Sequence, residues 1–191
     1  MTPRRLGILA GSFNPPTCAH VALMEAAAPQ VDEILCVIPR VFPHKLYHGA
    51  TLDDRLRMLE AIEPKGVPLS IGVAERGLFI DIARECREAY GTETRLAFLC
   101  GRDAAERIVE WDYGEPGAIE RMLKEFSLLV AARHGQYQPP PHLAHRIALL
   151  NMCGVWNEVS STEVRERVRR GEAWEEMVPA AIRPMVERIY R

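Results

Sequence analysis

The sequence predicts an α/β fold, a doubly wound parallel sheet followed by a C-terminal helical extension, on three observations. Short apolar runs alternate along the chain with stretches of helical periodicity. The runs are almost continuously apolar, as in strands whose two faces are both buried. The chain has 191 residues, 48% hydrophobic and 26% charged, which suits one domain with a sizeable core. We therefore expect a single domain over residues 1–191, with its helical extension at about 155–191.

The elements follow in order from bounded apolar runs and helical spacing. The expected strands are Leu6–Ala10, Ile34–Ile38, Leu69–Val73, Leu96–Cys100 and Leu128–Ala132. The expected helices between them are Ala19–Ala28, Asp53–Glu63, Leu78–Tyr90 and Asp103–Glu110. After the proline run at 139–141 the pattern predicts a helix, a short strand and two helices, near Thr162–Arg170 and Ala180–Tyr190. In such a sheet ligands bind at the carboxyl ends of the strands, where the strand order reverses.

Composition excludes several classes of protein. The net charge of -2 gives no basic field that would favour nucleic acid. No apolar run approaches the roughly 20 residues of a membrane helix, and the apolar N-terminal stretch is too short for a signal peptide. We therefore expect a cytoplasmic protein that binds neither nucleic acid nor membrane. Five cysteines without a Cys-x-x-Cys pair argue against structural zinc and disulfides, and Cys36 and Cys100 are expected to be buried free thiols.

The segment after the first expected strand reads GSFNPPTCAH over residues 11–20 and leads into a helix. Gly11 lets the backbone approach a ligand closely, and two prolines stiffen the turn. Thr17 and His20 lie three residues apart at the helix start, so both can point at one anion. The alternative is a capped helix with a partly buried imidazole. Because strand, glycine turn, double proline and helix start coincide, we favour an anion site.

A second segment, VSSTEVR, covers residues 159–165. Ser160 with Glu163 predicts a capping box at the start of a helix. The free amides, hydroxyls and positive dipole end of its first turn suit a phosphate. Ser161 and Arg165 lie four residues apart on one face, so the guanidinium can reach the same anion. Taken alone, the serine and glutamate form an ordinary helix cap.

The two segments together resemble the Gly-x-Phe-Asn-Pro-Pro-(His/Thr)-x-Gly-His and Ile-Ser-Ser-Thr-x-x-Arg signatures of the nucleotidyltransferase superfamily that includes the nicotinate-mononucleotide adenylyltransferases. The matching residues of the first signature are Gly11, Phe13, Asn14, Pro15, Pro16, Thr17 and His20. Thr17 stands where many members have His, Ala19 replaces Gly, and Val159 replaces Ile. The resemblance implies a Rossmann-like fold.

Further matches extend the resemblance over nearly the whole chain. They are Pro43-His44-Lys45, Arg55 with Met58-Leu59, Gly101-Arg102-Asp103, Trp111, Ala132-Arg133-His134-Gly135, Val178-Pro179 and Ile189-Tyr190. Three of these residues also have a simpler interpretation. Lys45 can be a solvated surface lysine, Asp103 a helix cap, and Trp111 a core residue. Trp156 and Trp174 are assigned to packing.

The resemblance implies an adenylyltransferase of NAD biosynthesis that transfers AMP from ATP to nicotinate mononucleotide and releases pyrophosphate. The catalytic residues it implies are His20, Thr17, Lys45 and Arg165. The residues that would hold ATP are Gly11, Ser12, Phe13, Thr17, His20, Asp103, Ser160, Ser161, Thr162 and Arg165. Lys45 would lie near the attacking phosphate and Trp111 would stack on the pyridine ring. Mg²⁺ would accompany ATP, bound through phosphates and water, with no metal site made by protein side chains.

One region departs from the family. Nicotinate-specific members carry a Ser-Tyr-Thr-x-Asp-Thr-Leu-like string after the third strand, where residues 77–83 here read GLFIDIA. Phe79 and Ile82 replace both threonines, so we expect them beside the mononucleotide and expect weaker discrimination against the nicotinamide form. The alternative is that they form the core face of the following helix.

Other functions stay open. The same signatures serve related transferases whose acceptor is nicotinamide mononucleotide or phosphopantetheine, and cytidylyltransferases. From a different class, a non-catalytic nucleotide-binding module is disfavoured because His20, Lys45 and Arg165 are all retained. The expected partners are small molecules, ATP and a pyridine mononucleotide. A homo-oligomer is compatible with the sequence, which does not set the oligomeric state.

Overall fold

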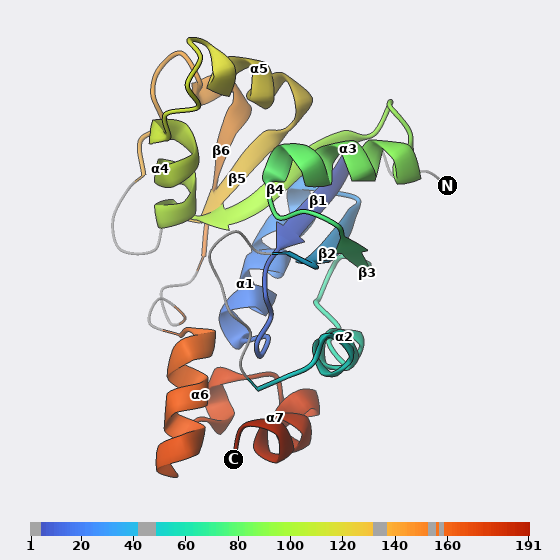
Figure 1. The fold of residues 1–191 in the computed structure, drawn as a ribbon, viewed down its shortest axis with the longest axis vertical. Coiled ribbons are helices and arrows are strands. Elements are labelled where there is room, and N and C mark those ends of the chain that lie inside the picture. Colours follow the sequence, from blue (N-terminus) through green and yellow to red (C-terminus); the bar gives the residue numbers. More distant parts are fainter. Residues whose placement is uncertain (1–4, 42–48, 132–136, 153–155, 157–158) are drawn as a thin grey trace.

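A parallel six-stranded sheet forms the centre of the computed structural model, which describes residues 5–41, 49–131, 137–152, 156 and 159–191 (Figure 1). The strands are β1 (Arg5–Ala10), β2 (Glu33–Pro39), β3 (Leu69–Ala74), β4 (Arg95–Gly101), β5 (Ser127–Ala131) and β6 (Ile147–Leu150). They are hydrogen-bonded in the order β3-β2-β1-β4-β5-β6, and every neighbouring pair is parallel. The predicted doubly wound α/β fold is confirmed.

The strand order reverses between β1 and β4. The chain moves from β1 outward to β2 and β3, then returns to β4 on the other side of β1 and continues to β5 and β6. Gly7 of β1 pairs with Ile34 of β2 and with Ala97 of β4, so β1 is central. A crevice outside the carboxyl ends of β1 and β4 is the ligand site that this topology provides.

The helices lie close to their predicted positions. They are α1 (Cys18–Ala27), α2 (Leu52–Glu60), α3 (Phe79–Tyr90), α4 (Arg102–Glu110), α5 (Ala118–Glu125), α6 (Ser161–Arg170) and α7 (Arg183–Tyr190). Helix α5 was not predicted, although Ile119, Met122 and Leu123 have helical spacing. The helix expected after the proline run is only a 3-10 turn, Ala144–Arg146, and another 3-10 turn, Ala180–Ile182, precedes α7.

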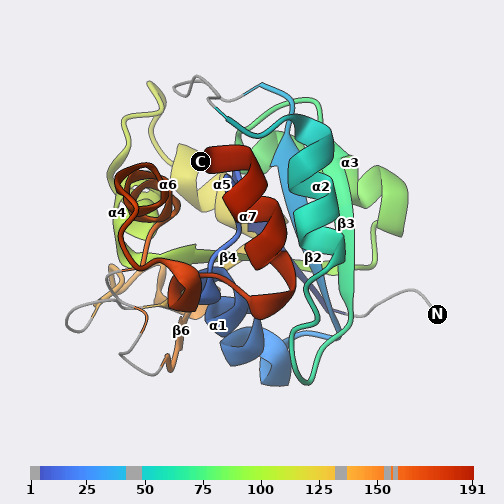
Figure 2. The same ribbon diagram turned by 90° about the horizontal axis from the view of Figure 1, so that it is seen from below.

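Two apolar cores lie on the two faces of the sheet. Successive side chains of β2 alternate between them: Ile34 and Cys36 face one core, Leu35 and Val37 the other. Buried residues of α1, α2, α6 and α7 join the first core, and those of α3, α4 and α5 join the second. The C-terminal helices therefore pack with α1 and α2, and Figures 1 and 2 show α2, α6 and α7 gathered at one end of the molecule.

Burial also decides the state of the cysteines. Cys36, Cys86 and Cys100 are buried free thiols, as expected for Cys36 and Cys100. Burial raises the pKa of Cys36 and of Cys100 to about 12, so both remain protonated at neutral pH. None of the described helices combines the length and the apolarity that a membrane crossing requires.

Candidate active site

The loop after β1 begins at the point where the strand order reverses. The amide of Gly11 donates to the carbonyl of Val37 at 3.0 Å, which continues the β1–β2 pairing by one step. Phe13 then adopts a left-handed backbone with φ of 46° while its side chain is 1% exposed. A bulky residue rarely adopts this conformation, so the loop has a shape that its surroundings must hold.

Thr17 and His20 form a reciprocal pair at the start of α1. Thr17 is the N-cap, and its amide donates to Nδ1 of His20 at 3.0 Å. Because an amide can only donate, Nδ1 is the acceptor, and the proton of the neutral ring belongs to Nε2. The ring of His20 is half-buried, with its centroid 5.2 Å from that of Phe13. The pair presents a fixed imidazole donor.

The structure changes the role expected for Thr17. The residue is 0% exposed, and its hydroxyl lies 2.8 Å from Nδ1 of His20. A buried hydroxyl that faces the imidazole has no surface for a triphosphate in this conformation. The contacts that the structure gives Thr17 orient the imidazole of His20.

Helix α6 begins where the second segment predicted. Ser160 is its N-cap, and the hydroxyl accepts the amide of Glu163 at 3.1 Å. The carboxylate of Glu163 is bonded to Arg167, whose Nε donates to it at 2.7 Å, so only one half of the predicted capping box forms. Ser160 and Thr162 are exposed beside the amides of the first turn, which is the end of a helix that attracts anions.

Two side chains of α6 contact the loop after β1. The hydroxyl of Ser161 donates to the carbonyl of Pro15 at 2.7 Å, across 146 residues. Nη1 of Arg165 donates to the carbonyl of Asn14 at 2.5 Å, and its Nη2 donates to the hydroxyl of Thr162 at 3.2 Å. The predicted sharing of one face by Ser161 and Arg165 is confirmed. The two segments that the sequence singled out form one site.

Sequence reasoning missed a second arginine on this face. A pocket of about 410 Å³ is lined by Thr162, Arg165, Glu166 and Arg169. Arg169 follows Arg165 by one helical turn, so the spacing could have revealed it. The pocket continues the cationic surface of α6 away from the loop.

The carboxyl end of β4 lies beside that of β1 in the sheet. Gly101 is the N-cap of α4, so Asp103 is the second residue of that helix and not its cap. A Cβ atom at Gly101 would meet no heavy atom within 4 Å in the described structure, so space is open above β4. Trp111 ends α4 and is 63% exposed, which excludes a core role and fits a side chain available for stacking.

The structure corrects the assignment of Ile82 to the mononucleotide. Ile82 is 0% exposed in the core beneath α3. Phe79 packs against that core, with its ring stacked on Phe98 at 4.2 Å between centroids. The side chain of Ile82 therefore lines no open surface, whereas Phe79 is only partly buried. The matches at Pro43-His44-Lys45 and Ala132-Arg133-His134-Gly135 lie outside the described residues, and Lys45 is therefore not placed.

The donor set of the site suits phosphate. It consists of an imidazole N–H, a guanidinium, hydroxyls and the amides of a helix N-terminus, all of which bind anionic oxygens. Within the described ranges no three His, Cys, Asp or Glu side chains gather as a metal site. The arrangement can orient a polyphosphate and neutralise charge on it.

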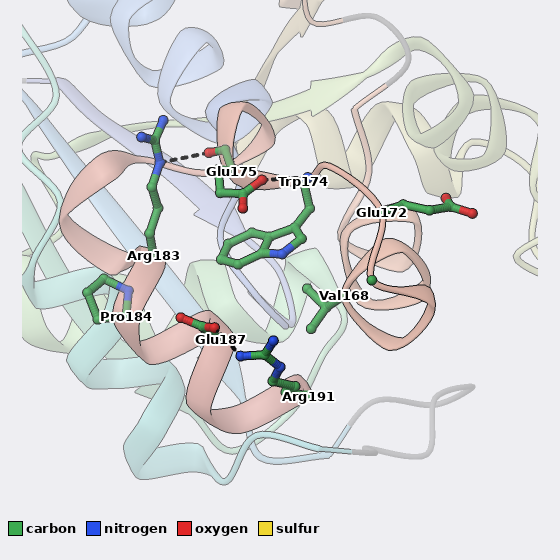
Figure 3. A pocket seen from close by; sticks show the side chains of 9 residues that line it. Val168, Glu172, Trp174, Glu175, Arg183, Pro184, Glu187 and Arg191 are labelled. Atoms are coloured by element: carbon green, nitrogen blue, oxygen red, sulfur yellow. Dashed lines mark hydrogen bonds and ion pairs between the residues drawn. The ribbon is translucent and has the colours of Figure 1, made fainter.

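A separate pocket of about 320 Å³ lies at the other end of α6, against α7 (Figure 3). Its lining includes Trp174, which is 8% exposed and confirms the packing role assigned to it. Nε of Arg183 donates to the carbonyl of Glu175 at 2.8 Å and so ties α7 to the preceding turn. None of the predicted site residues lines this pocket.

Comparison with known proteins gives a consistent family. Residues 8–167 match the cytidylyltransferase-like family. The chain is 27% identical, over 96% of both chains, to a protein of Exiguobacterium sibiricum. It is 31% identical to a protein of Gloeobacter violaceus, over 93% of this chain and 91% of the relative. Both are named "Probable nicotinate-nucleotide adenylyltransferase".

Solved structures agree on the fold. The nicotinic acid mononucleotide adenylyltransferase of Plasmodium falciparum, complexed with NaAD, superposes with a TM-score of 0.72 at 18% identity. The match covers 97% of this chain and 93% of that one. A putative nicotinate-nucleotide adenylyltransferase from Vibrio parahaemolyticus gives 0.60 at 12% identity, over 98% of both chains.

Proposed function

We propose an activity for this chain from the premise that it belongs to the cytidylyltransferase-like family and, within it, to the nicotinate-nucleotide adenylyltransferases. The chain is a nucleotidyltransferase. Its proposed reaction is the transfer of AMP from ATP to nicotinate mononucleotide, with release of pyrophosphate. The product is a dinucleotide in which two phosphates are joined by a new P–O–P bond.

One observation carries the proposal. Arg165 and Ser161 contact the carbonyls of Asn14 and Pro15, which lie in the same loop that leads to the imidazole of His20. A triphosphate laid along this loop would meet the imidazole on one side and the N-terminus of α6 on the other. Two separated anion-binding elements that share a loop suit a polyphosphate better than a single phosphate.

The proposed mechanism is direct displacement at the α-phosphorus of ATP. The phosphate of the mononucleotide attacks, the bond to the β-phosphate breaks, and the electron pair leaves with pyrophosphate. Nε2 of His20 donates to an α-phosphate oxygen, where negative charge is concentrated in the transition state. Arg165 and the first turn of α6 hold the β- and γ-phosphates and neutralise the leaving group. Positioning and charge neutralisation suffice, so no covalent enzyme intermediate is formed.

The other residues hold the two nucleosides. The open space above Gly101 supports a place for the adenylate sugar, with the carboxylate of Asp103 accepting from a ribose hydroxyl. Trp111 stacks on the pyridine ring and Lys45 approaches the attacking phosphate. Mg²⁺ would accompany ATP as its counter-ion and would neutralise phosphate charge, and phosphate oxygens and water would supply its ligands, since the described residues gather no cluster of metal-binding side chains.

Preference for nicotinate rests on backbone amides in this proposal. Leu78 is the N-cap of α3, and its apolar side chain makes no capping hydrogen bond. The first amides of α3, at Phe79 and Ile80, can therefore donate to the ring carboxylate. Because the side chain of Ile82 is buried in the core and that of Phe79 is apolar, the start of α3 offers the ring carboxylate only backbone donors, and we propose that nicotinamide mononucleotide is rejected only weakly.

A pyrophosphate-release assay tests the proposal. Purified chain with ATP and Mg²⁺ is supplied in turn with nicotinate mononucleotide, nicotinamide mononucleotide and phosphopantetheine, and CTP replaces ATP in a parallel series. We expect the highest kcat/KM for nicotinate mononucleotide with ATP and a lower value for the nicotinamide form. A large preference for another acceptor or for CTP would move the chain to that activity.

A further inference from the structure

The loop after β1 is held by donors that come from three helices outside it. Nη1 of Arg55, on α2, donates to the carbonyl of Ser12 at 3.1 Å. Arg165 and Ser161, on α6, donate to the carbonyls of Asn14 and Pro15. The hydroxyl of Tyr190, at the end of α7, donates to Oδ1 of Asn14 at 2.5 Å, across 176 residues. Three loop residues, Ser12, Asn14 and Pro15, are thereby fixed, and they lie on both sides of Phe13.

These donors fall into two kinds by exposure. Arg165 and Ser161 are partly exposed, so both can contact a substrate. Arg55 is 4% exposed and Tyr190 is 5% exposed, and Asn14, which Tyr190 contacts, is 6% exposed. A side chain buried to this degree has no surface to offer a nucleotide. Its effect on the reaction must pass through the loop.

The loop needs such support because Phe13 sits in the left-handed region at φ of 46°. A bulky residue keeps this conformation only where neighbouring contacts fix it on both sides. Arg55 holds the residue before Phe13, and Tyr190 holds the residue after it. The ring centroid of Phe13 lies 5.2 Å from that of His20, so loss of the left-handed conformation at Phe13 would displace the imidazole.

We propose that Tyr190 is a positioning residue for the nucleotide loop, acting through its hydrogen bond to Asn14, with Arg55 as its counterpart on the other side of Phe13. This inference rests on the proposed function, since the loop is the part that holds the triphosphate. It makes the last helix of the chain a component of the active site that touches no substrate.

Two features hold the hydroxyl of Tyr190 in place, and a third keeps it protonated. Helix α7 is tied to the turn before it by Arg183, which donates to the carbonyl of Glu175 (Figure 3). Nη2 of Arg183 also pairs with Glu176 at 3.0 Å. Val186, one turn before Tyr190, is 0% exposed in the core shared with α1 and α6. Burial raises the pKa of Tyr190 well above its ordinary value, so the phenol stays protonated and remains a donor.

The test compares a variant that lacks the hydroxyl of Tyr190 with a matched control variant. Tyr190→Phe keeps the ring in the core and deletes the donor to Asn14. Tyr90→Phe deletes a similar bond, from Tyr90 to the carboxylate of Glu33 at 3.0 Å, between α3 and β2 and away from the loop. Titration calorimetry with a non-hydrolysable ATP analogue gives Kd for the nucleotide, steady-state kinetics gives kcat and KM, and melting gives the stability of both variants.

We expect Tyr190→Phe to weaken binding of the ATP analogue and to lower kcat/KM for ATP about tenfold, with the Kd for the mononucleotide unchanged. Tyr90→Phe should leave all three values at the wild-type level. Equal values for Tyr190→Phe and wild type would overturn the proposal. The proposal would also be overturned if Tyr190→Phe weakened binding of both substrates equally and in proportion to a drop in Tm. That outcome would be a general structural effect.

The single variant Asn14→Ala covers the case in which Tyr190→Phe does not fold, and where both variants fold they complete a double-mutant cycle. Asn14→Ala removes the acceptor from the loop side, and we expect it to weaken the ATP analogue by a similar factor. If both residues act through one bond, Tyr190→Phe adds little in the Asn14→Ala background, whereas independent effects would contradict the proposal. If wild type binds the ATP analogue but transfers AMP to no acceptor, the proposed function fails while the analogue titrations still test the loop.

Discussion

Arg165 donates to the backbone carbonyl of Asn14 at 2.5 Å, although 151 residues separate them in the sequence. The contact joins the N-terminal part of α6 to the loop after β1. The guanidinium also donates to the hydroxyl of Thr162, so its plane is fixed before any ligand arrives. A preorganised cation loses little entropy when it binds a phosphate.

Replacing Arg165 by Ala should raise KM for ATP more than KM for the mononucleotide. The lost charged hydrogen bond contributes about 1.5–3 kcal/mol, which corresponds to roughly tenfold to a hundredfold in kcat/KM for ATP. Initial rates with each substrate varied in turn measure the difference. Arg170→Ala is the matched control, because Arg170 pairs with Glu166 on the exposed surface of the same helix. Equal weakening of both substrates would assign Arg165 a structural role.

His20→Ala should lower kcat by about 10²-fold, because an imidazole donor to the α-phosphate acts mainly on the transition state. Thr17→Val should cost less, since the amide of Thr17 still holds Nδ1 after its hydroxyl is removed. The readout is kcat under saturating ATP, with circular dichroism to check the fold. His142→Ala, at an exposed histidine beside Glu120, is the control. Near-wild-type turnover of His20→Ala would remove His20 from the mechanism.

Gly101→Val should reduce ATP affinity while leaving the thermal melt unchanged. The side chain would project from the end of β4 into space that no described atom fills, and the backbone at Gly101 has an ordinary extended conformation. Gly101→Ala fills less of this space and should have a smaller effect on Kd. Calorimetric titration with an ATP analogue compares the series. Unchanged affinity in Gly101→Val would place the adenylate elsewhere.

The tryptophans at 111 and 174 should respond in opposite ways to the same substitution. Trp111 is 63% exposed, so Trp111→Ala should raise KM for the mononucleotide and leave stability unchanged. Trp174 is 8% exposed in the core, so Trp174→Ala should destabilise the fold by about 3–5 kcal/mol. Denaturant unfolding and substrate kinetics separate the two effects. A stability loss at Trp111 without a change in KM would remove the stacking role.

The sequence predicted the sheet well because buried parallel strands are short, continuous apolar runs. Every strand expected up to residue 132 appears with bounds shifted by about one residue. The two signature segments were found for a related reason, since a helix N-terminus that binds anions needs small polar residues at fixed positions.

What the sequence could not supply were contacts across the fold. Nothing in local spacing indicates that Tyr190 reaches Asn14, or that Arg55 reaches Ser12. The burial of Ile82 is a similar case, because a helical period fits both a core face and a pocket wall. Only the packing of α3 on Phe98 and its neighbours decides between them.

The most direct test of the account follows the α-phosphorus of ATP. The chain is incubated with Mg²⁺, nicotinate mononucleotide and ATP labelled at the α-phosphate, and label is followed in the dinucleotide, in pyrophosphate and on the protein. We predict one labelled dinucleotide for each pyrophosphate released, with no label on the protein. Label retained on the chain, or ATP consumed without a labelled dinucleotide, would contradict direct adenylyl transfer at this site.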